Sequence, residues 1–217
     1  MDQAERERIR ALWQPERALQ REGFRLIAGM DEVGRGPLAG PVVAAAVILP
    51  QGCLIEGIND SKQLRADQRA LLADEIAKQA IAVGVGAAGI REIKRLNILG
   101  ASQQAMREAL GKLDPQPEAV LVDGRPVPGI NMHQQALIKG DSLSISIAAA
   151  SIMAKVARDL IMEQMDELFP GYGFASNKGY ATREHLEALA ELGPCLLHRR
   201  AFAPVAGLAQ MQIVQSV

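Results

Sequence analysis

Four acidic residues stand where apolar segments of the chain end, and side chains of this type could bind metal ions. They are Asp31, Glu32, Asp123 and Asp141, and a glycine lies close to each of them. Carboxylates are seldom buried without a partner, and several at one edge of a sheet repel one another and take up protons. A divalent cation relieves that repulsion, and Mg²⁺ and Mn²⁺ prefer oxygen ligands and bind phosphate oxygens well. The pattern therefore predicts a Mg²⁺ or Mn²⁺ site with chemistry directed at phosphate groups.

The first two acids are neighbours in the sequence, which constrains how they can meet. A regular strand would point Asp31 and Glu32 to opposite faces of the sheet. We expect them to converge because the strand ends or bulges there, a geometry that Gly34 and Gly36 make accessible. Any one acid alone is more typical of a turn or a cap. The hypothesis of a metal site therefore depends on all four acids together.

The elements that must position these acids follow from the hydrophobic pattern. Apolar runs predict strands, and amphipathic stretches predict helices, one of which breaks near Asn97. This order of strands and helices predicts an α/β architecture, a mixed sheet with helices on its faces. The predicted strands cover residues 24–30, 42–49, 81–88, 119–122 and 136–138, and the predicted helices cover 2–22, 65–80, 90–113, 144–168 and 182–192.

Two glycine motifs could be mistaken for phosphate-binding loops. The segment Gly29–Gly36 has the glycine spacing of a P-loop, but it lacks the Lys and Ser/Thr and carries two acids that would repel phosphate. The segment Gly84–Gly89 matches the GxGxxG fingerprint of dinucleotide-binding proteins. The acid expected at the end of the next strand is missing, because the nearest candidate, Glu108, lies in a predicted helix. We therefore favour small-residue packing of a strand, and a nucleotide-binding module remains an alternative.

Composition limits the kinds of partner that the chain can have. The net charge is −1, so a broad basic surface for nucleic acid is excluded, and any polyanion site must be local or must recruit metal ions. One Trp, two Tyr and four Phe are too few for binding single strands by many stacked bases. The apolar stretch Pro37–Pro50 is too short to span a bilayer, and the first residues show no secretory signal. We expect a cytoplasmic protein that does not bind membranes.

Five segments resemble those of ribonuclease HII, the bacterial type 2 ribonuclease H, and they occur in the same order. The first contains Asp31-Glu32-Val33-Gly34-Arg35-Gly36, and the resemblance extends over roughly residues 24–205. The chain departs from the family pattern at Ala201, where the family usually has Ser, so a role for that hydroxyl is in doubt. The matching segments are Ala28–Val43, Asn59–Leu64, Val122–Gly124, Lys139–Asp159 and Tyr172–His185.

The resemblance implies a ribonuclease H-like fold, a mixed five-stranded sheet flanked by helices with a small C-terminal helical extension. It implies three parts along the chain. Residues 1–23 would form an N-terminal helical arm, residues 24–181 the catalytic domain, and residues 182–217 an extension packed on that domain. We expect a monomer, as in the family.

The resemblance also implies an activity. The family hydrolyses the RNA strand of RNA–DNA hybrids and cuts on the 5′ side of single ribonucleotides embedded in duplex DNA. Carried over to this chain, the four acids would be both the catalytic residues and the ligands of Mg²⁺ or Mn²⁺. Two such ions can activate water and stabilise the leaving 3′ oxygen, which gives a 5′-phosphate and a 3′-hydroxyl.

Substrate-binding residues are implied by the same resemblance. Gly34, Arg35 and Gly36 would line the minor groove and sense the 2′-hydroxyl, the group that separates RNA from DNA. Tyr180 would pack on the deoxyribose just 3′ of the ribonucleotide, and Lys62 would contact a phosphate. We expect a basic rim from the C-terminal helices, made of Arg183, Arg199 and Arg200.

Two other functions remain open from the residues alone. A DNA-cutting nuclease of the same fold would use the four acids but would not need the Gly34–Gly36 sensor or Tyr180. A non-enzymatic nucleotide-binding module would use Gly84–Gly89 and would not need four acids at strand ends. The histidines do not share a metal-ligand spacing, and we expect His185 to be a surface or capping residue.

Overall fold

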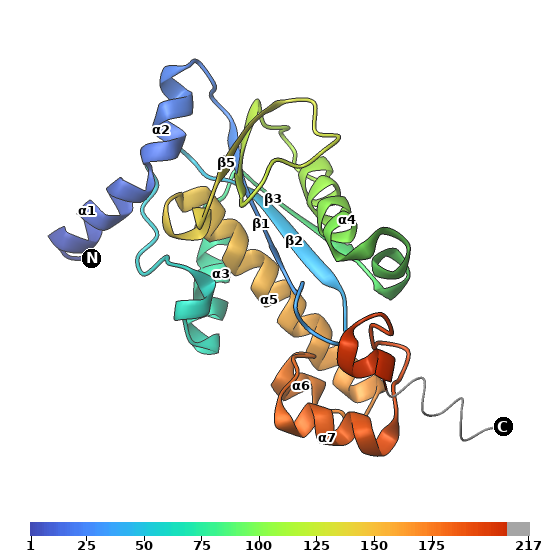
Figure 1. The fold of residues 1–217 in the computed structure, drawn as a ribbon. Coiled ribbons are helices and arrows are strands. Elements are labelled where there is room, and N and C mark those ends of the chain that lie inside the picture. The colour runs from blue at the N-terminus through green and yellow to red at the C-terminus, as the bar shows by residue number, and fades with distance from the viewer. Residues whose placement is uncertain (208–217) are drawn as a thin grey trace.

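The computed structural model describes residues 1–207 and contains one mixed sheet of five strands in the order β3-β2-β1-β4-β5 (Figure 1). The first three strands along the chain pair antiparallel, and β1, β4 and β5 pair parallel. The predicted α/β fold with a mixed five-stranded sheet is confirmed. The strands are β1 Ile27–Val33, β2 Val42–Ile48, β3 Ala82–Ala88, β4 Ala119–Asp123 and β5 His133–Leu137.

Helices cover both faces of the sheet (Figure 1). The long helix α5 (Ile145–Leu168) and α3 (Ala66–Gln79) pack on one face, and the N-terminal helix α1 (Gln3–Leu12) joins the same apolar cluster. Helix α4 (Ile90–Gly111) covers the other face. The apolar core therefore consists of two layers, one on each side of the sheet.

Small residues let the helices approach the sheet closely. A Cβ atom at Gly29 of β1 would overlap the backbone of α5. Cβ atoms at Gly84 and Gly86 of β3 would overlap the carbonyl oxygens of Ala109 and Ala105 in α4. The first two glycines of the GxGxxG match therefore serve strand–helix packing, which confirms the interpretation that we favoured.

The N-terminal helices are tied to the core rather than lying freely on the surface. The single predicted helix is interrupted at Trp13, and α2 (Gln14–Arg21) follows. The Trp13 indole N–H donates to the Cys53 carbonyl at 3.0 Å. The buried carboxylate of Glu16 accepts hydrogen bonds from Ser144 and Ser146, at the beginning of α5.

Two further boundaries have clear physical reasons. The predicted break in α4 is confirmed, because Asn97 has a φ of 58° and its side chain caps the next turn through the Leu99 N–H. Strand β5 begins at His133, three residues before the prediction, since its sequence HQQAL is that of a polar edge strand. Such a strand lacks the apolar run on which the prediction depended.

The C-terminal part packs against the end of α5 (Figure 1). It contains α6 (Phe174–Asn177) and α7 (Arg183–Leu192), with Phe174 and Leu189 fully buried. The division of the chain into arm, catalytic domain and extension stays a prediction, and residues 208–217 of the predicted extension lie outside the described residues. Within residues 1–207, no helix is both long and apolar enough to cross a membrane.

Candidate active site

The four predicted acids lie at one edge of the sheet, where three parallel strands end. In β1 and β4, Met30 pairs with Val122, so Asp31 and Asp123 directly follow paired residues on neighbouring strands. Asp123 in turn pairs with the last residue of β5. The chain then makes the 3₁₀ turn η2 (Gly140–Ser142), which carries Asp141. The parallel pairing of β1, β4 and β5 therefore brings the acids together.

The backbone at Asp31 and Glu32 differs from our prediction. Strand β1 neither ends nor bulges at Glu32, because its pairing with β2 continues in register to Val33. Its pairing with β4 stops at Met30, and this leaves the β4 side of the strand open beside Asp123. Glu32 still experiences the charge of Asp123, which contributes to its raised pKa. The prediction that the strand ends here is therefore wrong for its pairing with β2 and correct for its pairing with β4.

Burial and mutual repulsion disfavour charge on these acids. Burial of Asp31, followed by the charge of Glu32, raises its pKa to about 8, although hydrogen bonds from Ser151 and from the Glu32 N–H oppose the change. Burial also raises the pKa of Glu32 and of Asp123. The Gly140 N–H donates to Asp123 Oδ1 at 2.7 Å and orients that carboxylate. The acids are therefore buried together and repel one another, which is the condition that a divalent cation corrects.

Two cationic side chains partly neutralise the acids in this structure. Lys62 Nζ lies 3.2 Å from Asp141 Oδ2, and Arg35 Nη1 lies 3.1 Å from Glu32 Oε1. In residues 1–207 no three His, Cys, Asp or Glu side chains are arranged as a ready set of metal ligands. The donor set itself is all-oxygen and its repulsion is only partly relieved, so its chemistry fits Mg²⁺ or Mn²⁺.

Two buried arginines hold the loop that follows the acid pair, residues 34–41, which we call the glycine loop. Arg199 donates to the carbonyl oxygens of Gly34 at 2.6 Å and Gly40 at 2.8 Å, and to that of Arg35 at 2.9 Å. Arg158 of α5 holds the far end of the loop by donating to Pro41 O at 3.0 Å. The sequence had suggested an exposed basic rim that included Arg199. For Arg199 that expectation is wrong, because its side chain is buried and bonded to the backbone, whereas Arg183 and Arg200 are exposed.

The two glycines of the predicted sensor differ in their surroundings. Gly34 has a φ of +93°, and a Cβ there would overlap the side chain of Arg158. A Cβ at Gly36 would have no heavy atom within 4 Å. The fold itself therefore requires glycine at position 34, whereas the space beside Gly36 is open.

Tyr180 lies next to the glycine loop, and the residue is 41% exposed. The preceding carbonyl, that of Gly179, accepts the Leu38 N–H of the loop at 2.8 Å. The Arg158 guanidinium carbon lies 5.8 Å from the centroid of the Tyr180 ring. The predicted sensor and the predicted sugar-contacting tyrosine are thus brought side by side.

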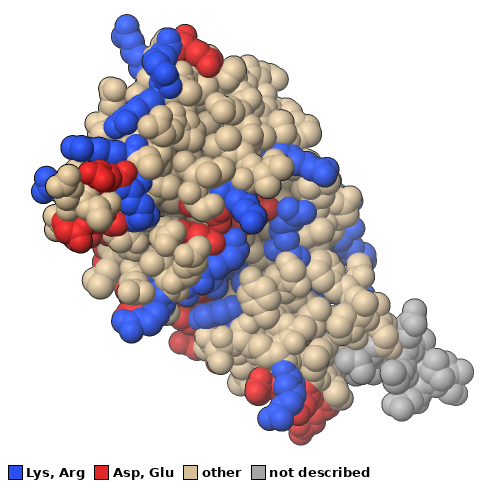
Figure 2. Space-filling view, turned by 60° about the vertical axis from the view of Figure 1, so that its left-hand side comes forward, with Lys and Arg blue, Asp and Glu red and all other residues tan. Residues whose placement is uncertain are grey.

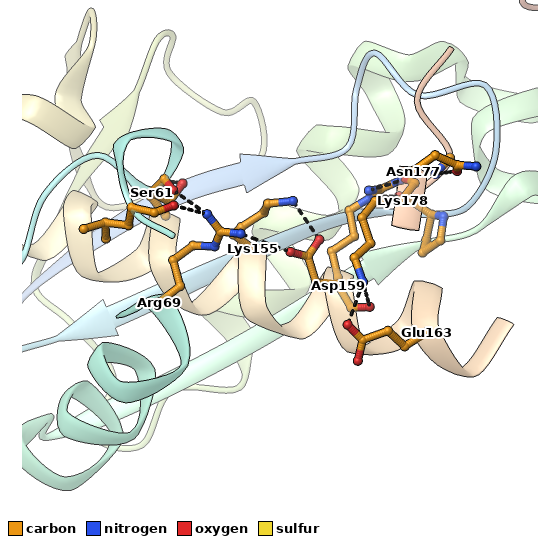
Figure 3. Close-up of polar contacts among 12 residues, drawn as sticks. Ser61, Arg69, Lys155, Asp159, Glu163, Asn177 and Lys178 are labelled. Carbon is orange, nitrogen blue, oxygen red and sulfur yellow. Dashed lines mark hydrogen bonds and ion pairs between the residues drawn. The ribbon is translucent and has the colours of Figure 1, made fainter. Parts of the chain in front are cut away.

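Polar contacts beside α5 run from Ser61 to Lys178 (Figure 3). Arg69 donates to the Ser61 carbonyl at 3.0 Å, and Lys155 Nζ donates to Asp159 at 2.7 Å. Lys178 Nζ lies 2.6 Å from Glu163. Figure 2 shows Lys and Arg side chains with acidic ones among them along a hollow on one face of the molecule. This face therefore carries several Lys and Arg side chains, and Arg69, Lys155 and Lys178 among them are paired with acids.

One more expectation from the sequence is wrong. His185 is fully buried, and its Nε2 lies 3.1 Å from Nε2 of the buried His198. Sequence periodicity gives no signal for such a pair, since the two histidines lie on separate segments and meet only through the packing of the C-terminal part.

Comparisons with known proteins agree with this geometry. The model of the family described as Ribonuclease HII matches residues 28–205. Ribonuclease HII of Moorella thermoacetica is 58% identical over 198 residues, which are 91% of this chain and 96% of the relative. The crystal structure of ribonuclease H2 from Pyrococcus horikoshii superposes with a TM-score of 0.72 at 25% identity and covers 86% of this chain and 98% of its own.

A second solved structure shares the fold alone. Bst ribonuclease HIII in complex with Mn²⁺ superposes with a TM-score of 0.68 at 21% identity, covering 86% of this chain and 70% of its own. The family match spans nearly the whole described chain and includes every acid of the sheet edge. The chain therefore belongs to the ribonuclease HII family, the endoribonucleases that hydrolyse the RNA of RNA–DNA hybrids.

Proposed function

We propose that this ribonuclease uses divalent metal ions held by its four strand-end acids and cuts on the 5′ side of single ribonucleotides in duplex DNA, as well as in longer hybrids. The observation that carries the proposal is the cluster of acids, in which burial and repulsion raise the pKa of Asp31 to about 8. The Mn²⁺ in the Bst ribonuclease HIII structure supports a divalent ion in this fold.

The residues that would hold the ions are Asp31, Glu32, Asp123 and Asp141. When bound, two such ions would supply an activated water and stabilisation of the leaving 3′ oxygen, so that the products carry a 5′-phosphate and a 3′-hydroxyl. The side chains of Lys62 and Arg35 contact these acids in this structure. They are placed to turn toward phosphate once the acids have another cationic partner.

Recognition of the 2′-hydroxyl is proposed for the backbone of Gly34, Arg35 and Gly36. The open space beside Gly36 supports a close approach of a sugar, because no Cβ would stand in the way. Arg158 and Arg199 hold the loop in one conformation, so its backbone groups are preorganised. A site that hydrogen bonds to a hydroxyl can reject a substrate lacking it by a factor of about 10⁴.

Tyr180 and Lys62 are proposed to place the duplex. The exposed face of Tyr180 beside the glycine loop suits packing on the deoxyribose that follows the ribonucleotide. Lys62 is 78% exposed and within reach of the acids, which suits a contact with a phosphate near the cut. Phosphate contacts of this kind orient the duplex without reading its sequence.

The decisive experiment is cleavage of a labelled DNA duplex that carries one ribonucleotide, beside an all-DNA duplex of the same sequence. We expect one cut 5′ of the ribonucleotide with Mg²⁺ or Mn²⁺, none with a chelator, and none in the all-DNA duplex. Asp123→Asn should abolish the cut, while Asp74→Asn, an exposed acid of α3, should leave it unchanged. Cleavage of the all-DNA duplex would favour the DNA-cutting nuclease instead, and full activity of Asp123→Asn would contradict the proposed metal site.

A further inference from the structure

A buried pair of histidines links the C-terminal part to the proposed substrate-binding residues. His185 lies on α7, and His198 lies on the segment that follows it, and both are almost fully buried. Their Nε2 atoms are 3.1 Å apart. The rings of Tyr172 and Phe174 pack against the pair, with centroids 5.0 and 5.4 Å away from His198 and His185 respectively.

The partners of the pair fix where each proton lies. The carbonyl oxygen of Tyr180 can only accept, so His185 carries its proton on Nδ1 and donates it at 2.7 Å. The backbone N–H of Cys195 can only donate, so Nδ1 of His198 accepts it at 3.0 Å and carries no proton. His198 must then be protonated on Nε2, and it donates to the free Nε2 of His185. One arrangement of protons therefore satisfies every hydrogen bond from the Tyr180 carbonyl to the Cys195 N–H, and both imidazoles are neutral in it.

The two ends of this chain of hydrogen bonds return to the glycine loop. The Gly40 N–H donates to the Leu197 carbonyl at 3.0 Å, and the Arg199 N–H donates to the Leu38 carbonyl at 2.8 Å. The residue between Leu197 and Arg199 is the second histidine. At the other end, the Leu38 N–H donates to the Gly179 carbonyl, next to the tyrosine. The loop, the histidine pair and the tyrosine thus form a closed ring of contacts.

We propose that His185 and His198 are positioning residues that hold the backbone of Tyr180 in register with the glycine loop, so that the enzyme recognises sugar and 2′-hydroxyl at one fixed spacing. This inference rests on the proposed function in one respect, the contact of Tyr180 with substrate. The Tyr180 carbonyl also accepts the Thr182 N–H at 2.8 Å, so both of its lone pairs are used. The backbone of the tyrosine is therefore held from two directions.

These hydrogen bonds require both imidazoles to be neutral. An added proton on either histidine would place two donors against each other, at the His185–His198 contact or at Cys195. The titratable groups that face the pair are the Cys195 thiol, at 3.2 Å from His198 Nδ1, and the Tyr172 phenol. Burial raises the pKa of both groups, so neither supplies a negative charge to favour an imidazolium. Burial lowers the pKa of His185 and lowers that of His198 to about 4.

The first test needs no substrate. In the wild-type protein, ¹⁵N chemical shifts of the imidazole nitrogens at pH 7 should show His185 protonated on Nδ1 and His198 on Nε2, and each should gain its second proton only at a lower pH than an ordinary histidine does. The opposite tautomer of either residue, or a charged imidazole at pH 7, would overturn the proposal. This outcome is independent of whether the enzyme acts on single ribonucleotides.

The second test separates positioning from general stability. His185→Phe fills the space but removes the donor to Tyr180, and we expect KM for the single-ribonucleotide duplex to rise about fivefold to tenfold with kcat changed less than about twofold. His185→Asn keeps a donor near Nδ1 and should restore most of the loss. Leu110→Ala, a buried position of α4 in the apolar cluster on the other face of the sheet, is the control: it should lower the melting temperature and leave KM unchanged.

The route through the tyrosine is tested in a Tyr180→Ala background. There, His185→Phe should have no further effect on KM, because the side chain that it positions is gone. An equal effect in both backgrounds would assign the histidine a general structural role and overturn the inference. If Tyr180→Ala alone left KM unchanged, the proposed contact of Tyr180 with substrate would be wrong. The tautomer measurement would still report whether the two histidines are hydrogen bonded as we propose.

Discussion

The guanidinium group of Arg199 donates to the carbonyl oxygen of Gly34 at 2.6 Å, which joins the C-terminal segment to the loop directly after the first two acids. The same side chain reaches the carbonyls of Arg35 and Gly40. Burial, together with the nearby charge of Arg158, lowers the pKa of Arg199 to about 9. A planar group with several donors can satisfy three carbonyls at once, so arginine is suited to this place.

Replacing Arg199 should disturb the glycine loop. We expect Arg199→Lys to lower the free energy of unfolding by about 2–3 kcal/mol, since a single ammonium group cannot reach all three carbonyls. KM for a single-ribonucleotide duplex should rise in parallel because the loop loses its fixed conformation. Denaturant unfolding and steady-state kinetics measure the two effects. The matched control is Arg95→Lys on the exposed surface of α4, and equal behaviour of both variants would contradict the role given to Arg199.

The two sensor glycines should respond differently to alanine. Gly34→Ala places a side chain at a φ of +93° and against Arg158, so we expect a clear loss of stability. Gly36→Ala has open space around the new methyl group, so the melting temperature should stay within about 2 °C of the wild type. The methyl group would instead stand where we propose that a sugar approaches, and cleavage of the ribonucleotide duplex should fall at least tenfold. A Gly36→Ala enzyme with normal kinetics would argue against sensing by this backbone.

The sheet and its acids could be predicted from the sequence because both depend on local patterns. Apolar runs ended at Asp31 and Asp123, and glycine followed closely. The buried polar residues could not be predicted in this way. Arg158, Arg199 and His185 are satisfied mainly by backbone carbonyls of loops, and for the arginines these are distant in the sequence. Only the folded chain shows that such partners exist, so the same residues were expected at the surface or given no role.

The raised pKa of Asp31 makes the stability of the metal-free protein depend on pH. The folded protein holds a proton on Asp31 up to about pH 8, whereas the unfolded chain releases it near its ordinary, lower pKa. The free energy of unfolding should therefore fall as the pH rises toward 8 and this proton must be given up. Asp31→Asn removes the penalty, so in a chelator at pH 8.5 the variant should melt at a higher temperature than the wild type.

Two further measurements complete that prediction. Asp74→Asn changes an exposed acid of α3 and should leave the pH dependence of melting as in the wild type. Added Mg²⁺ or Mn²⁺ should stabilise the wild type more than Asp31→Asn, because only the wild type keeps all four of the proposed carboxylate ligands. A melting temperature of Asp31→Asn below that of the wild type at pH 8.5 in chelator would show that repulsion is not the dominant effect.

Lys62 contacts Asp141 and is proposed to contact a phosphate, so its replacement should change duplex binding and metal affinity in opposite directions. Its ammonium group lies 3.2 Å from Asp141 and 3.7 Å from Asp60. Lys62→Met should weaken duplex binding uniformly across sequences, about tenfold, and reduce the salt dependence by about one released counterion. The same change removes a cation that competes for Asp141, so the metal-free protein should bind Mn²⁺ more tightly. Lys78→Met on the exposed side of α3 is the control for both titrations. Loss of metal affinity in Lys62→Met would show instead that the lysine orients Asp141 as a ligand.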